Sequence, residues 1–145
     1  MNDDYHCLQC DIPVSKGLHD FSVSVYGVPL CIRHQILIQE SFASEEAKAL
    51  FIALKSNKVP AVLEYSDGLK TIDIAIPGKL YIEVEGKGHD DADEAMTDLL
   101  RTFQSWDKER IPTIRIPNAL VSNPSLFQKA VDCLTTLCIE GASQR

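Results

Sequence analysis

Long apolar runs and an excess of positive charge are both missing from this chain of 145 residues. No apolar run approaches the ~18–20 residues that span a bilayer, and no charged segment followed by an apolar one opens the sequence. We therefore expect a cytoplasmic protein without a membrane-spanning segment. The net charge of −7 argues against generic, salt-driven binding of nucleic acid, but it permits a metal-dependent nuclease whose carboxylates bind cations.

Disulfides are not expected either, because the positions of the five cysteines favour metal binding. Cys7 and Cys10 form a CxxC pair, and Cys31 and His34 form a second pair after twenty intervening residues. Two such pairs supply the four ligands of a tetrahedral zinc site, which leaves no open position and is therefore structural. His6 and His19 are alternative ligands that lie outside this spacing, and free thiols are the alternative without a metal.

The chain between the two pairs alternates over Phe21–Tyr26 and has Gly27 as a turn residue, which predicts a β-hairpin. This segment resembles a zinc ribbon or half of a LIM-type finger. We expect a small zinc-binding module at residues 1–40, followed by an α/β domain at residues 41–145. Cys133 and Cys138 fall in a C-terminal helix, where we expect them to be buried as small hydrophobic side chains.

Residues 41–145 read as helix, three strands, helix, strand and helix. Three consecutive strands predict an antiparallel meander, and a strand after a crossover helix can add alongside it, which gives an α/β sandwich with a mixed sheet. The helix expected at residues 90–106 carries an apolar stripe that we expect to be buried: Ala92, Met96, Leu99, Leu100, Phe103 and Trp106. The last helix is expected to bury another: Leu126, Phe127, Ala130, Val131, Leu134 and Leu137.

Acidic residues gather on two strands joined by the turn Pro77-Gly78. In the first strand Ile72, Ile74 and Ile76 are expected on one face and Asp73 on the other. In the second strand Ile82 and Val84 are expected on the apolar face. Opposite them come the acidic side chains and the two basic residues that follow: Glu83, Glu85, Lys87 and His89.

Like charges on one face repel, so this arrangement predicts a divalent cation or a proton that neutralises them. A solvated charged sheet face is the alternative.

The ordered motifs resemble the PD-(D/E)XK nuclease core, and more closely its branch of very-short-patch-repair-like, restriction-type endonucleases. In that branch the second strand carries an aspartate after an apolar residue, and the third reads apolar-Glu-x-acid-Gly-x-x-His. The matching segments here are Ile72-Asp73 and Ile82-Glu83-Val84-Glu85-Gly86-Lys87-Gly88-His89. Further similar pieces are Asp98 with Arg101, the strand Ile111–Ile116, and the helix that begins at Asn123-Pro124.

The resemblance implies a restriction-endonuclease-like fold and a metal-dependent deoxyribonuclease. Asp73, Glu83 and Glu85 would bind catalytic Mg²⁺ or Mn²⁺, and Lys87 or His89 would position the water or protonate the leaving oxygen. The signature has two registers, Glu83-Val84-Glu85 and Glu85-Gly86-Lys87, and both stay open.

Two other functions compete with DNA cleavage. One is a catalytically degenerate nuclease fold that acts as an adaptor, with its zinc module binding a protein or DNA. The other is a metal-dependent hydrolase of a small phosphoester, because carboxylates alone do not specify a polymeric substrate.

Overall fold

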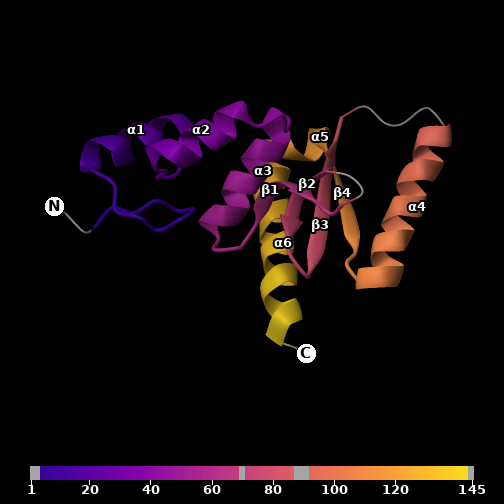
Figure 1. Ribbon diagram of the computed structural model, residues 1–145. Coiled ribbons are helices and arrows are strands. Elements are labelled where there is room, and N and C mark those ends of the chain that lie inside the picture. Colours follow the sequence, from indigo (N-terminus) through magenta and orange to yellow (C-terminus); the bar gives the residue numbers. More distant parts are fainter. Residues whose placement is uncertain (1–3, 69–70, 87–91, 144–145) are drawn as a thin grey trace.

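A computed structural model describes residues 4–68, 71–86 and 92–143 (Figure 1). The chain is mixed α/β and contains a four-stranded mixed sheet, and its element order after residue 41 is the predicted one except for one additional short helix before the last. Within this described part, none of the helices combines the length and the apolar character needed to cross a membrane. Lys87 and His89, two of the predicted site residues, lie outside the described residues.

The sheet has the strand order β1-β2-β3-β4. Its strands are β1 (Val62–Ser66), β2 (Thr71–Ile76), β3 (Leu80–Glu85) and β4 (Thr113–Pro117). The first three form the predicted antiparallel meander, with Gly78 at φ 79° in the turn between β2 and β3, a left-handed conformation that glycine adopts without strain. β4 pairs parallel to β3 after the crossover helix α4 (Ala92–Glu109), as expected.

Two helices cover one face of the sheet. α3 (Glu45–Ser56) begins where the Ser44 side chain accepts a hydrogen bond from the Ala47 backbone N–H, 3.1 Å away, which is the predicted N-cap. α6 (Pro124–Ser143) follows the short helix α5 (Asn118–Val121), and the Asn123 carboxamide oxygen caps its first turn. The Lys79 ammonium donates to the Cys138 carbonyl oxygen at 2.8 Å, which ties the β2–β3 turn to α6.

The predicted β-hairpin near the N-terminus is wrong. Residues there form α1 (Lys16–Tyr26) and α2 (Ile32–Glu40), and the described chain before α1 contains a single isolated β-bridge, between His6 and Pro13. Ser15 caps the start of α1, and Gly27 ends it in a left-handed conformation.

The alternation that suggested a strand is a coincidence of spacing. On a helix, Leu18, Ser22 and Tyr26 recur every four residues, and these side chains face the protein while Phe21 and Val25 are more than half exposed.

Buried side chains form two clusters on opposite faces of the sheet. The larger one continues from the N-terminal helices through α3 and the sheet to α6. The smaller one contains Ile72, Ala75, Tyr81 and Ile111. Ile72 was expected beside Ile74 and Ile76, but it lies in the smaller cluster. Glu64, opposite Asp73 on β1, has a left-handed φ of 54°, so the regular pleat is interrupted at this point.

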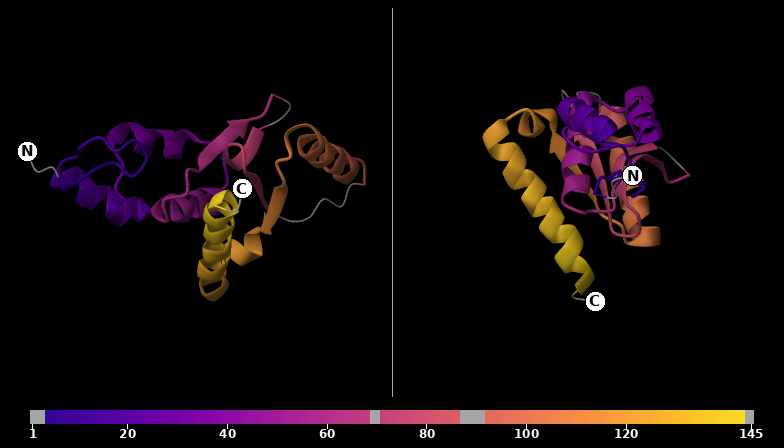
Figure 2. Two further views of the ribbon diagram at one scale, coloured as in Figure 1. Left: turned by 90° about the horizontal axis from the view of Figure 1, so that it is seen from below. Right: turned by 90° about the vertical axis from the view of Figure 1, so that its left-hand side faces the viewer.

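The apolar stripe of α4 is exposed, contrary to the expectation that it is buried. Met96, Leu99, Leu100, Phe103 and Trp106 each keep between 47% and 59% of their surface accessible. Figures 1 and 2 show why: α4 lies beyond β4, away from α3 and α6, so it contributes little to the core. The side chain of Ala92 is outside the described set.

The expectation for the last helix is also wrong in part. Val131 and Leu134 are buried, whereas Leu126 and Leu137 are exposed. Of the two cysteines on this helix, Cys138 is buried as expected and Cys133 is exposed.

Candidate functional site

Four side chains from the two predicted motifs converge near the N-terminus. The ligand atoms of Cys7, Cys10, Cys31 and His34 all lie within 4.8 Å of one another. All five cysteines of the chain are free thiols. The structure thus brings together the residues that the CxxC and CxxH spacing selected.

The distances within this cluster suit a tetrahedral zinc ion. Zn–S bonds of about 2.3 Å and Zn–N bonds of about 2.0 Å place two sulfurs about 3.8 Å apart and a sulfur and a nitrogen about 3.5 Å apart. The Cys10 and Cys31 Sγ atoms are 3.9 Å apart, and His34 Nδ1 lies 3.6 Å from Cys7 Sγ and 3.1 Å from Cys31 Sγ. A disulfide needs sulfurs about 2.05 Å apart, so the spacing of these ligand atoms fits a metal centre and not a disulfide.

Local backbone structure sets the ligand positions. The Cys7 carbonyl accepts from the Asp11 N–H at 2.8 Å, and Asp11 takes a left-handed φ of 64°, which closes the turn around the first pair. Cys31 is the N-cap residue of α2, so His34 projects from the first turn of that helix beside it.

Burial and nearby donors tune the ligands. Burial raises the pKa of the Cys7 thiol, but backbone N–H groups around it, including that of Cys31, outweigh this and leave the pKa lowered. Burial, helped by the charge of Arg33, lowers the pKa of His34, which favours the neutral imidazole that a metal binds. Burial raises the pKa of Cys31, because it disfavours the charged thiolate, and a bound cation would stabilise that thiolate.

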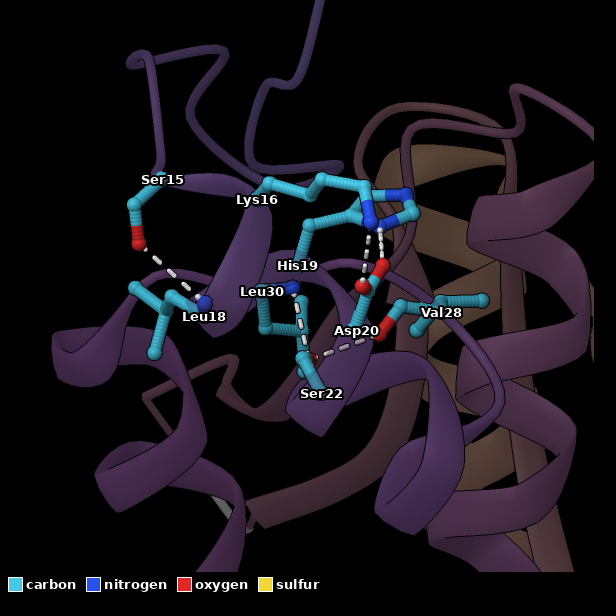
Figure 3. A network of polar contacts seen from close by, with 8 residues as sticks. All are labelled: Ser15, Lys16, Leu18, His19, Asp20, Ser22, Val28 and Leu30. Atoms are coloured by element: carbon cyan, nitrogen blue, oxygen red, sulfur yellow. Dashed lines mark hydrogen bonds and ion pairs between the residues drawn. The ribbon is translucent and has the colours of Figure 1, made fainter.

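Two other histidines, His6 and His19, stay outside the cluster. His6 Nδ1 lies 2.9 Å from the Asp11 carbonyl oxygen. The His19 ring packs against the Tyr5 ring at a tilted angle with centroids 4.5 Å apart, and His19 pairs with Asp20 at 3.0 Å. Figure 3 shows the contact between His19 and Asp20 on α1.

A second candidate site lies on the face of the sheet opposite α3. Ile82 and Val84 of β3 point into the larger cluster, so the alternating residues Glu83 and Glu85 share the other face with Tyr81. All three acids of the predicted site, including Asp73, are partly buried.

Asp73 is held where β2 and β3 stop pairing. Their backbone pairing ends at Ile74 opposite Ile82. Beyond that point the Asp73 Oδ2 atom accepts a hydrogen bond from the Val84 N–H at 2.9 Å, in place of a strand carbonyl. This bond fixes the Asp73 carboxylate at the backbone of Val84, the residue after Glu83.

Arg115 is the site residue whose role the sequence analysis missed. It lies opposite Glu83 in the parallel pairing of β3 and β4, and its Nε donates to Glu85 Oε1 at 3.0 Å. The sequence did place Arg115 on the face of its strand opposite Ile114 and Ile116, because side chains alternate along a strand. Its contact with Glu85 depends on the parallel pairing of β4 with β3, which the sequence does not specify.

The three acids do not form a preformed cluster. Within the described residues, only the cysteine–histidine group brings three or more ligand atoms within 4.8 Å of one another. On the same face, burial, aided by the Glu109 carboxylate 3.2 Å from the hydroxyl, raises the pKa of Tyr81 to about 12. That hydroxyl is therefore a neutral donor at physiological pH.

Comparison with protein-family models, with curated proteins and with solved structures finds no match for this chain. The fold and the first site together define a mixed α/β protein with a cysteine–histidine cluster suited to a metal ion such as zinc.

Proposed function

We propose that this protein is a metal-dependent, endonuclease-like hydrolase of DNA phosphodiester bonds, with a restriction-endonuclease-like core. The observation that carries the proposal is the hydrogen bond from the Val84 N–H to Asp73, which holds this carboxylate at the backbone next to Glu83, where β2 and β3 stop pairing. The resemblance of the sequence motifs to the PD-(D/E)XK core supports it. The cysteine–histidine centre is assigned a structural role with zinc.

Metal-assisted hydrolysis does not require three protein ligands that are already in place. Mg²⁺ is usually held by one or two carboxylates and completes its shell with water and substrate phosphate, so Asp73 and Glu83 suffice as protein ligands. Bound there, Mg²⁺ or Mn²⁺ would supply an activated water and stabilise charge on the phosphate. Arg115 would contact the anionic substrate, with Glu85 orienting its guanidinium. Lys87 and His89 keep their roles as water-positioning or proton-donating groups from the sequence motif.

A non-cleaving adaptor is the second candidate. The observation in its favour is the Glu85–Arg115 pair, in which a predicted metal ligand is already neutralised by an internal cation. In this alternative the fold binds DNA or protein without hydrolysis.

Plasmid nicking with Mg²⁺ or Mn²⁺ tests the proposal. Asp73→Asn retains an oxygen that accepts from Val84 but removes the negative charge, so it separates metal binding from folding. We expect Asp73→Asn and Glu83→Gln to lower the nicking rate about a hundredfold or more, the scale of losing one electrostatic stabiliser of a transition state. Glu45→Gln is the matched control, because this acid on α3 is 89% exposed and away from the sheet face.

Each outcome separates the candidates. If both variants nick the plasmid at the wild-type rate, the proposed site is wrong. Failure of the wild-type protein to cleave any DNA form, together with no calorimetric binding of Mg²⁺ or Mn²⁺, would replace the nuclease proposal with the adaptor.

A further inference from the structure

A groove separates the N-terminal helices from the outer edge of the sheet. Its volume is about 490 Å³, within the range of ligand sites, and it lies between α2 and β1. The zinc-centre residue His34 forms part of its wall. Figure 1 shows that β1 is the strand nearest the N-terminal helices.

The groove presents apolar side chains that the fold leaves uncovered. Phe42, in the link between α2 and α3, is 98% exposed, and Leu37 of α2 is 52% exposed. Both line the groove together with Val62 of β1. An aromatic side chain this exposed at the edge of a groove is the kind of anchor that buries itself against a partner.

The backbone edge of β1 borders the same groove. β1 pairs only with β2 among the described strands, so its other edge is unpaired. Val62, Leu63 and Glu64 are consecutive and all line the groove, which requires the strand edge, not just one face, to border it. An unpaired edge is a template for one more strand, but the left-handed φ of Glu64 limits regular pairing to the residues before it.

The polar groups of the groove favour a ligand that carries hydrogen-bond donors and positive charge. The side-chain carbonyl oxygen of Gln9 is buried and has no hydrogen-bond partner within the described structure, which is costly unless a donor arrives. Glu40 and Glu64 contribute carboxylates, and the residues described as lining the groove include no lysine or arginine.

We propose that this groove binds a short extended segment of a partner protein. The segment would add to the edge of β1 at Val62 and Leu63, place an apolar side chain against Phe42 and Leu37, and carry lysine or arginine toward Glu40. This site is separate from the sheet face of the proposed nuclease and does not depend on it.

Fluorescence anisotropy of the full-length, zinc-loaded protein tests the proposal. The probes are end-blocked, fluorescein-labelled heptapeptides with leucine, valine, phenylalanine or tryptophan at the centre, threonine beside it and lysine at both ends. We expect saturable binding below about 1 mM, which corresponds to the few kcal/mol that one buried anchor can provide. Glutamate-ended versions should bind at least about tenfold more weakly.

Variants assign the binding to the groove. Phe42→Ala should weaken it by about tenfold or more, the value of burying one large apolar side chain, and should leave the fold intact because Phe42 has almost no contacts to lose. Glu40→Lys should reverse the preference in favour of the glutamate-ended peptides. Phe21→Ala on α1, also exposed, is the matched control and should bind as the wild type does.

Nuclear magnetic resonance completes the test, with amide shifts expected at Val62 and Leu63 on saturation. The proposal is overturned if no probe binds, if Phe42→Ala and Glu40→Lys leave binding unchanged, or if the shifts fall elsewhere. It is also overturned if sedimentation shows that a second copy of the chain occupies the groove and excludes the peptides.

Discussion

A single buried serine, Ser22, connects helix α1 to the loop that leads into Cys31. Ser22 is completely buried on α1, where its hydroxyl donates to the Val28 carbonyl at 2.7 Å and accepts from the Leu30 N–H at 2.8 Å (Figure 3). Both partners belong to the loop that leads into Cys31. The hydroxyl satisfies two buried backbone groups at once and so holds the second ligand pair in place.

Replacing this hydroxyl should therefore destabilise the protein. We expect Ser22→Ala to lower the free energy of unfolding by about 1–3 kcal/mol, because two buried polar groups lose their partner. Urea denaturation of the zinc-loaded protein measures it. Ser24→Ala on the same helix is exposed and should change the value by less than about 0.5 kcal/mol. Equal effects of the two substitutions would show that the Ser22 bridge contributes nothing.

Helices α3 and α4 differ in what their apolar stripes contact. In the sequence both carry large apolar residues at helical spacing. In the structure α3 packs on the sheet and α6, with Leu50 and Leu54 completely buried. On α4, by contrast, Leu99 keeps 59% of its surface exposed. Periodicity identifies an amphipathic helix, but it does not say which surface the apolar side will meet.

The two helices should therefore respond differently to the same truncation. Leu50→Ala should cost about 2–5 kcal/mol through lost burial and the remaining cavity. Leu99→Ala on α4 should cost less than about 1 kcal/mol, because a half-exposed side chain loses little contact. Thermal or urea unfolding compares them. A cost at Leu99 close to that at Leu50 would mean that α4 is buried in solution.

The largest cluster of buried side chains runs from the N-terminal segment through the sheet to α6. It contains the ligands Cys7 and Cys31 as well as Leu50 of α3 and Val131 of α6. The candidate metal centre is thus built into the same core as the sheet. Its occupancy should contribute to the stability of the entire chain, in addition to that of the N-terminal helices.

Metal removal tests this connection. Elemental analysis should find about one zinc ion per chain, the number that one four-ligand site holds. A strong chelator should lower the unfolding temperature and remove the helical signal of the N-terminal segment. Cys7→Ser should do the same without chelator, while Cys133→Ser, an exposed thiol outside the centre, should melt as the wild type does. Metal-free protein with an unchanged melt would contradict the assignment.

Local signals predicted much of this structure correctly. The ligand set follows from the spacing of Cys7, Cys10, Cys31 and His34, because paired ligands a few residues apart can reach one ion wherever the chain between them goes. The cap at Ser44 and the turn at Gly78 follow from backbone chemistry within a few residues. For the same reason the order of helices and strands after residue 41 could be read from the sequence.

Long-range packing decided the rest. The alternation at residues 21–26 is typical of a strand, but these residues form a helix in which Ser22 contacts the loop before Cys31. Arg115 meets Glu85 because β4 pairs parallel to β3, which no local pattern specifies. The placement of α4 beyond β4 leaves its apolar stripe exposed. Local chemistry therefore determined the members of the cysteine–histidine cluster and most elements, and tertiary contacts determined which faces are buried and which charges meet.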